Sequence, residues 1–299
     1  MTVPGASDPS GAPPEAMPVR GPALTRRLLA QPRAVLGLAL LTGLFLLAFA
    51  GPHLARWDWQ QTDFTALREP PSAEHWFGTT ASGRDVFALT VRGLQKSLLI
   101  GLSVAVLSTG LAALVGMVAG YAGGWADRVL MGVTDLLLVL PAFLVLAVLG
   151  PTLGSAWPLL VPALAAFMWM VTARMVRQAT ISLKEREFVL AARCMGVSPA
   201  RVLVRHLLPN LGSLLIIDGT LHVGAAVIAE SGLSYFGFGV RPPDSSLGTV
   251  IAEGAAAATT FPWLFGFAAA LLVLLVLAVN LVGDGLRDAL DPTGGGGVR

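Results

Sequence analysis

The chain has 299 residues, of which 55% are hydrophobic and 13% are charged, and its formal net charge is +2. Soluble domains carry about 25% charged residues, so this composition excludes an ordinary soluble domain and indicates a membrane protein. The small net charge gives no support for a nucleic-acid-binding surface. The single cysteine, Cys194, excludes an internal disulfide framework and a multi-cysteine metal site.

Residues 1–30 are predicted to form a disordered cytoplasmic tail, because their start is rich in proline and glycine and has almost no apolar periodicity. The uncharged run 34–52 follows, and about 20 helical residues cross the hydrocarbon core. Since no small-residue cleavage site clearly follows this run, we expect it to be kept as an anchor. Residues 31–93 are then the first transmembrane helix and an external loop, 53–93.

Five more segments are apolar enough to cross a bilayer. The second crossing is the uncharged run between Lys96 and Asp127. A longer run after it is broken by Gly150-Pro151 and Gly154 into two spans. The third to sixth crossings are predicted at about 129–149, 157–176, 211–235 and 263–283. The fold class is therefore an all-α membrane protein with six transmembrane helices. Its main transmembrane domain is expected at 94–290, and a flexible tail at 291–299.

The distribution of positive charge predicts the orientation of the chain. With six crossings both termini share one side, and most of the 20 Lys and Arg residues then lie on that side. Because cytoplasmic loops carry an excess of Lys and Arg, the N- and C-termini and the segment 182–209 are expected in the cytoplasm. The loops 53–93 and 237–262 then face outward.

The segment 182–209 reads as two short helices joined by a corner. Ser182 to Glu185 has the spacing of a capping box, which predicts that a helix starts there. Gly196 suits a left-handed C-terminal cap, and Ser198-Pro199 reads as the N-cap and first residue of a second helix that runs until Pro209.

The first of these helices is expected to gather Phe188, Ala191, Ala192 and Met195 on one face, since they fall at i, i+3, i+4 and i+7. An amphipathic loop lying on the anionic inner leaflet is one interpretation of the segment. A rigid knob that fits a groove in a partner protein is the other, because two helices around a sharp corner suit a groove better than a flat surface.

Residues 189–210 resemble the EAA loop of ABC-importer membrane subunits, whose pattern is Glu-Ala-Ala, three residues, Gly, nine residues, an apolar residue, one residue and Leu-Pro. Leu190 stands in place of the glutamate and His206 in the apolar place, while Glu187, one turn earlier, could supply a carboxylate. The resemblance implies contact with an ATPase subunit through these residues: Glu187, Leu190, Ala191, Ala192, Gly196, Ser198, Pro199, Arg201, His206, Leu208 and Pro209.

Four further stretches are similar to the dipeptide, oligopeptide and nickel permease branch of the ABC importers, and most closely to its C-type subunit. They are His75–Thr79 with Gly83–Val86, Tyr121–Gly124 with Asp127, Ala229–Gly237 with Pro242-Pro243, and Asn280–Asp288. This resemblance implies the type I importer permease fold in the inner (plasma) membrane. It also implies a homologous partner permease, two ATP-binding cassette ATPase subunits and an extracytoplasmic substrate-binding protein.

The chain itself is not expected to be an enzyme or to bind a cofactor. The sequence contains no GxxxxGK[ST] phosphate loop, so ATP would be hydrolysed by another chain. Its four histidines and one cysteine are scattered and offer neither a catalytic constellation nor a metal cluster. An ion-coupled secondary transporter is a distant alternative, since we find no clear repeat and no ion site.

Ionisable residues in the fifth crossing are candidates for the translocation path or its gate. Asp218 and His222 are one helical turn apart, so a local pair could neutralise both; a metal path through His222 is the other interpretation. Glu230, near the outer end, could line the path or brace the gate. The substrate implied by the branch is a short peptide, with nickel or a metal chelate as the alternative.

Overall fold

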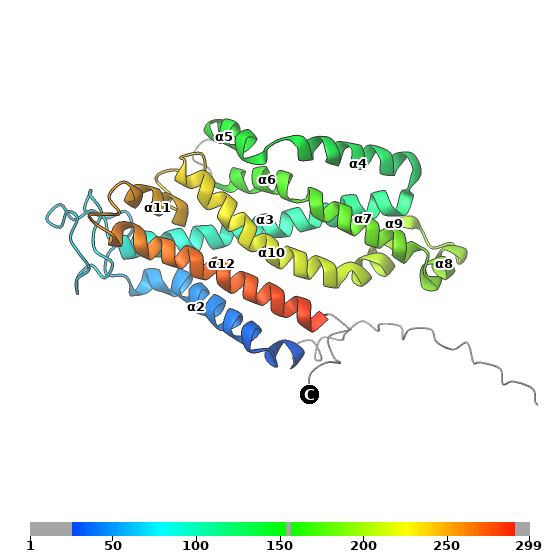
Figure 1. Ribbon diagram of the computed structural model, residues 1–299, viewed down its shortest axis with the longest axis horizontal. Coiled ribbons are helices and arrows are strands. Elements are labelled where there is room, and N and C mark those ends of the chain that lie inside the picture. The colour runs from blue at the N-terminus through cyan, green and yellow to red at the C-terminus, as the bar shows by residue number, and fades with distance from the viewer. Residues whose placement is uncertain (1–25, 154–156, 291–299) are drawn as a thin grey trace, which may run out of the picture.

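The computed structural model describes residues 26–153 and 157–290, and its secondary structure there is helical (Figure 1). The helices are, in chain order, α2 (Pro32–Leu54), α3 (Val86–Ala122), α4 (Gly124–Val139), α5 (Ala142–Leu153), α6 (Trp157–Met168), α7 (Met170–Lys184), α8 (Glu187–Cys194), α9 (Pro199–Val202), the π-helix η1 (Leu203–Leu207), α10 (Leu208–Tyr235), α11 (Leu247–Ala255) and α12 (Trp263–Leu290).

Four helices of the described chain are long and apolar enough to cross a membrane unaided: Pro32–Leu54, Val86–Ala122, Pro199–Tyr235 and Trp263–Leu290. The predicted third and fourth crossings are not straight helices. Each is a pair, with α4 and α5 bent by 81° and α6 and α7 by 49°, so the count reaches six if each bent pair is one span. Pro141 lies in the first break, where its missing N–H prevents helix continuation.

Helix α3 is the axis of the bundle and packs against α7, α10 and α2. It begins at Val86, so the outer loop predicted at 53–93 ends earlier than expected. Asp85 caps it by accepting a hydrogen bond from the backbone N–H of Ala88 at 2.7 Å. Gly101 lets α10 approach closely, because a Cβ there would lie 2.6 Å from Val227 Cγ2.

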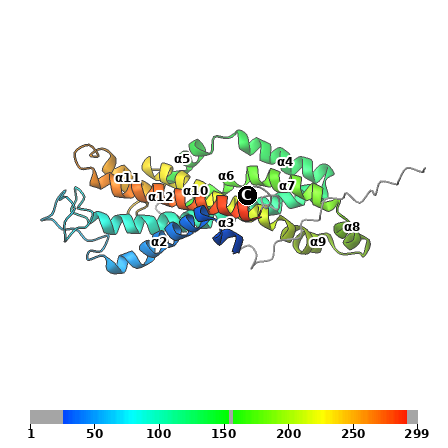
Figure 2. The same ribbon diagram turned by 60° about the horizontal axis from the view of Figure 1, so that its bottom comes forward.

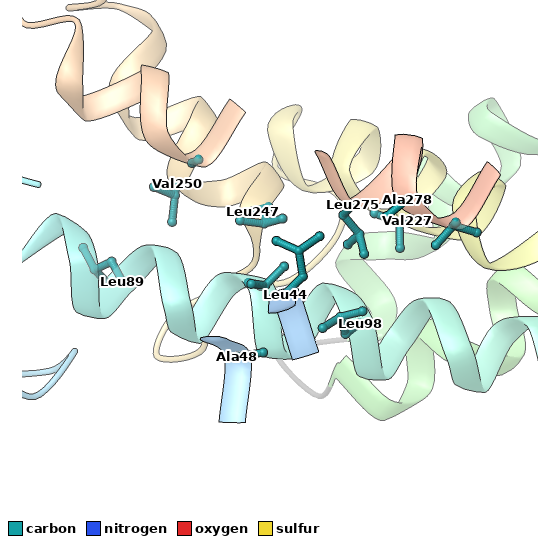
Figure 3. Packing of buried hydrophobic residues seen from close by; sticks show 12 residues of the cluster. Leu44, Ala48, Leu89, Leu98, Val227, Leu247, Val250, Leu275 and Ala278 are labelled. Carbon is teal, nitrogen blue, oxygen red and sulfur yellow. The ribbon is translucent and has the colours of Figure 1, made fainter. Parts of the chain in front are cut away.

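The largest core cluster joins five helices toward the end of the bundle that holds α11 (Figure 3). Following the predicted orientation, that end is called the outer end below, and the end that holds α8 and α9 is called the inner end (Figures 1 and 2). Leu44 and Leu98 of α2 and α3 meet Val227, Leu247 and Leu275 of α10, α11 and α12 there. A second cluster connects the inner ends of α3, α7 and α10 with the residues that follow α7. The two clusters therefore fasten opposite ends of the bundle.

Both views place α8 and α9 at one end of the molecule and α11 at the other (Figures 1 and 2). One predicted boundary needs correction: residues 26–29 are helical, so the tail predicted at 1–30 is shorter. Helix α12 continues to Leu290, past Asp284, where the sixth crossing is predicted to leave the bilayer. The remainder of the N-terminal tail, 1–25, and the tail predicted at 291–299 lie outside the described residues.

Candidate functional site

The segment 182–209 protrudes from the inner ends of α3, α7 and α10 and is called the knob below. Its predicted start was wrong. Ser182 lies inside α7, which ends at Lys184 with Glu185 as C-cap, and α8 begins at Glu187 after Arg186. Helix α7 continues past Ser182 because its last turn packs on α3. There the Lys184 Nζ donates a hydrogen bond to the carbonyl oxygen of Gly120 at 2.9 Å.

The predicted apolar face of α8 is not the one that packs inside the chain. Val189 and Ala192 are buried, and Val189 packs with Val202 and Leu207 in the inner core cluster. The other predicted members of the face, Phe188, Ala191 and Met195, are exposed. The periodicity predicts that Ala191 and Ala192 lie on the same helix face, but only Ala192 is buried. The exposed apolar side chains of α8 are therefore free to contact another molecule.

The corner of the knob has the predicted geometry. Gly196 has φ +76°, and its N–H donates to the carbonyl oxygen of Arg193. The N–H of Val197 donates to the carbonyl oxygen of Ala192, which completes a Schellman motif. Ser198 and Pro199 take the N-cap and first positions of α9, although the Ser198 side chain makes no capping hydrogen bond.

The second helix of the knob does not end at Pro209. It continues from Pro199 to Tyr235 as one run of 37 residues, with a π-helical turn at Leu203–Leu207. The N–H of Leu208 donates to the carbonyl oxygen of Leu203, five residues back. Because proline lacks an N–H and its ring crowds the preceding turn, this wider turn admits Pro209 without a break. The knob is thus continuous with the fifth predicted crossing.

The remaining members of the predicted coupling set differ in exposure. Glu187, Leu190 and Arg201 are exposed, and His206 and Leu208 are half-buried. Arg193 lies over the ring of Tyr121 at 6.0 Å, which joins the knob to the end of α3. The Tyr121–Gly124 stretch is the turn between α3 and α4, and Gly123 and Gly124 both have positive φ there.

The structure brings Asp218 and His222 together, as their spacing predicts. His222 Nδ1 lies 3.0 Å from Asp218 Oδ2, and Thr172 of α7 donates to the same carboxylate at 2.6 Å. His222 Nε2 is 3.0 Å from the carbonyl oxygen of Met168, at the end of α6. Since both partners flank the bend between α6 and α7, the pair ties α10 to that bend.

Glu230 is fully buried among serines. Ser234 donates to its Oε1 at 2.6 Å and Ser97 of α3 to its Oε2 at 3.0 Å. The two serine oxygens in turn accept backbone N–H groups, from Val240 at 2.9 Å and Leu247 at 3.3 Å. Glu230 therefore connects α3 and α10 to the middle of the loop before α11 and to the start of α11, which is the geometry of a brace.

A basic cluster at the outer end of α3 was missed by sequence reasoning. Lys96 is buried, lies 3.0 Å from Asp244 and stands over the ring of Trp157 at 4.3 Å, while Arg92 contacts the same carboxylate. Burial raises the pKa of Asp244, but hydrogen bonds and charges of Lys96 and Arg92 outweigh it and lower the pKa. The spacing of Arg92 and Lys96, one turn apart beside an apolar run, was the available signal.

The outer motif His75–Thr79 with Gly83–Val86 organises the loop between α2 and α3. His75 is buried, stacks on Trp57 and lies 2.9 Å from Asp85, the residue that caps α3. Arg84 reaches across to Glu253 of α11 at 2.9 Å. These contacts hold the loop between α2 and α3 against the start of α3 and against α11. Within the described ranges, no group of three or more His, Cys, Asp or Glu side chains could hold a metal ion.

Comparison with known proteins identifies the family. Residues 112–293 match the model of binding-protein-dependent transport system inner membrane components, and residues 24–71 match the N-terminal transmembrane domain of oligopeptide transport permease C. The chain belongs to this permease family. It is 55% identical over 271 residues to the oligopeptide transport system permease protein OppC of Mycobacterium tuberculosis H37Rv, covering 90% of this chain and 93% of that one. It is 36% identical over 259 residues to OppC of Bacillus subtilis, covering 87% and 85%.

Family membership confirms that the chain is a membrane permease subunit and not an enzyme. The predicted resemblance is likewise confirmed over most of the chain. The second family match begins at residue 24 and covers α2 and part of the outer loop, while the first covers the knob, α10 and α12.

Proposed function

We propose that this chain is the membrane-spanning permease of an ATP-driven importer of short peptides. It forms the translocation path with a homologous permease, couples to two ATPase subunits through the knob, and receives substrate from an extracytoplasmic binding protein. Both termini and the knob are cytoplasmic. The names of its relatives support a peptide substrate, and the excess of Lys and Arg on the side of the knob supports the orientation.

The observation that carries the coupling role is the direct continuity of the knob with a transmembrane helix. Pro199–Tyr235 is one helix, and its knob end is clamped by the Gly196 corner and by the buried Val202 and Leu207. When the ATPase subunits close, they would displace the knob. Because the knob and α10 form one continuous helix, α10 would move with it, whereas a flexible loop between them would not transmit the motion. Rotation of the two permeases against each other would open the path alternately to each side.

The contact with the ATPase is apolar at the position where the family pattern has glutamate. Leu190 is exposed, as are Phe188 and Met195, whereas Val189 and Ala192 are turned inward. Glu187, in the first turn of α8, is exposed and keeps a carboxylate within one turn of that position. An apolar contact supplemented by this carboxylate replaces the ion pair that a glutamate at 190 would make.

A charge on this apolar surface should release the ATPase subunits. Met195→Asp replaces a side chain that is 76% exposed in the isolated chain, so its effect on folding should be small. Burial of such a side chain in an interface contributes about 1.5–3 kcal/mol, so affinity should fall roughly tenfold to a hundredfold. Co-purification of the ATPase subunits with the tagged permease measures this loss.

The matched control is Met195→Leu, which keeps an apolar surface of similar size and should retain the ATPase subunits. Equal recovery of ATPase with Met195→Asp and Met195→Leu would contradict the proposed docking surface.

A further inference from the structure

His222 lies where α10 passes the break between α6 and α7, and each nitrogen of its ring is in contact with an oxygen atom. Helix α6 ends at Met168 and α7 begins at Met170, and the two are bent by 49°. His222 Nε2 is 3.0 Å from the carbonyl oxygen of Met168, and Nδ1 is 3.0 Å from Asp218 Oδ2. The side chains of His222 and Asp218 are only 14% and 18% exposed.

These two contacts fix how many protons the pair holds. A carbonyl oxygen only accepts hydrogen bonds, so the hydrogen in the contact with Met168 belongs to Nε2. In the other contact, an ionised carboxylate and an unprotonated Nδ1 would both be acceptors, so a second hydrogen must lie between them. The pair therefore holds one proton more than a neutral histidine beside a carboxylate. With that proton on either Nδ1 or Oδ2 the pair has no net charge, which a membrane-spanning segment favours.

The helices that pack on this part of α10 carry no other titratable side chain at its level. Helices α5 and α6 have none within their bounds, α3 has none between residues 96 and 121, and α12 has none before residue 284. On α7, Arg174 follows Thr172 by two residues, but it is hydrogen-bonded to Asp135 of α4. With both ring nitrogens engaged, His222 also has no lone pair for a metal ion.

The protonated pair holds α10 to both sides of the break. Met168 is the last residue of α6, where carbonyl groups generally lack an intrahelical partner, and His222 supplies a donor. On the other side, Thr172 of α7 donates to Asp218 Oδ2 at 2.6 Å. Without the shared proton, two acceptors would face each other, so the contact with Met168 or the contact within the pair must open. Asp218 and His222 with this proton are called the clamp below.

We propose that the clamp positions the α6–α7 bend during transport. This inference rests on the proposed function, in which α10 moves with the knob as one helix. Helices α6 and α7 run along α10 (Figure 1), and the clamp carries the movement of α10 to the break between them. When the clamp loses its proton, α10 moves without the bend, and ATP is hydrolysed with little uptake.

Asp218→Asn tests the role of the proton, because the amide carries permanent hydrogens in place of the shared one. Its nitrogen can donate to Nδ1 of a neutral His222 while Nε2 still donates to Met168, and its oxygen can accept from Thr172. The contacts should therefore form at any pH. In the matched double variant Asp218→Asn/His222→Phe, an aromatic ring remains without a donor, so no clamp forms and no charge is buried unpaired.

Peptide uptake and ATP hydrolysis are measured in proteoliposomes that hold the whole transporter, with the same pH on both sides of the membrane. The readout is uptake per ATP hydrolysed, and each variant is compared with wild type at the same pH, so that titration of the other subunits cancels. From pH 7 to pH 9.5 the ratio of Asp218→Asn to wild type should rise at least about fivefold, because only the wild-type pair loses its proton. The double variant should stay at least about fivefold below Asp218→Asn at both pH values.

A ratio that does not change with pH would overturn the clamp, as would a double variant that transports as well as Asp218→Asn. Loss of uptake by Asp218→Asn at pH 7 would also overturn it, because the amide would then have failed to replace the shared hydrogen. These three outcomes require an active wild-type transporter. If wild type itself shows no uptake that requires ATP, the proposed function fails, and the clamp that rests on it fails with it.

Discussion

A valine at position 196 should abolish most ATP-driven uptake while leaving the permease in the membrane. Gly196 has φ +76° in the Schellman corner of the knob. A β-branched residue is strongly disfavoured at positive φ, and holding it there costs about 1–3 kcal/mol. The corner would then re-form in another conformation and tilt α8 away from its proposed contact with the ATPase. Uptake by reconstituted transporter should fall roughly tenfold or more, with permease yield nearly unchanged.

Gly196→Asn is the matched control, because asparagine tolerates the left-handed conformation. A Cβ at this position meets no atom within 4 Å, so neither variant creates a clash inside the chain. Asparagine should therefore keep most of the uptake that valine removes. If valine and asparagine reduced uptake equally, the conformation of the corner would not be what coupling depends on.

Glu230→Leu should destabilise the outer half of the protein severely. The leucine cannot accept the hydrogen bonds of Ser97 and Ser234, and both hydroxyls would stay buried without an acceptor. Each unsatisfied buried group costs about 1–3 kcal/mol. The two serines also hold the backbone at Val240 and Leu247, so the loop before α11 should loosen with them. Thermal unfolding of the detergent-solubilised complex, followed by loss of the monodisperse peak, measures the effect.

Glu230→Gln keeps a carbonyl acceptor and adds an amide donor in the same volume, and it should recover much of the stability. If Glu230 acts as a brace, the unfolding temperature of the leucine variant should lie far below that of the glutamine variant at every substrate concentration. A residue that instead served only to contact substrate would give equal unfolding temperatures for the two variants and an altered dependence on peptide concentration.

The four long apolar helices and the knob corner were predictable because their signals are local. An uncharged run of sufficient length indicates a membrane helix whatever surrounds it, and glycine followed by Ser198-Pro199 specifies a corner within a few residues. The pairing of Asp218 with His222 follows equally from their separation by one turn.

Other features depend on contacts between distant segments. Ser182 has the spacing of a helix start, but packing of α7 on Gly120 of α3 carries the helix past it. Pro209 has the residue type of a helix end, but the π-turn before it accommodates the ring. The inward face of α8 is chosen by Val202 and Leu207 of the following turns, which periodicity within α8 does not reveal. The bend between α4 and α5, by contrast, lies at Pro141 and has a local signal.

ATP-dependent uptake in proteoliposomes is the most direct test of the account. The vesicles hold this permease, its partner permease, two ATPase subunits and the binding protein, and receive either a labelled short peptide or a labelled nickel chelate. Peptide accumulation that requires ATP and binding protein, and that Gly196→Val removes, is the predicted result. Accumulation of the nickel chelate without peptide would contradict the peptide assignment. Uptake driven by an ion gradient in vesicles lacking the ATPases would contradict the importer itself.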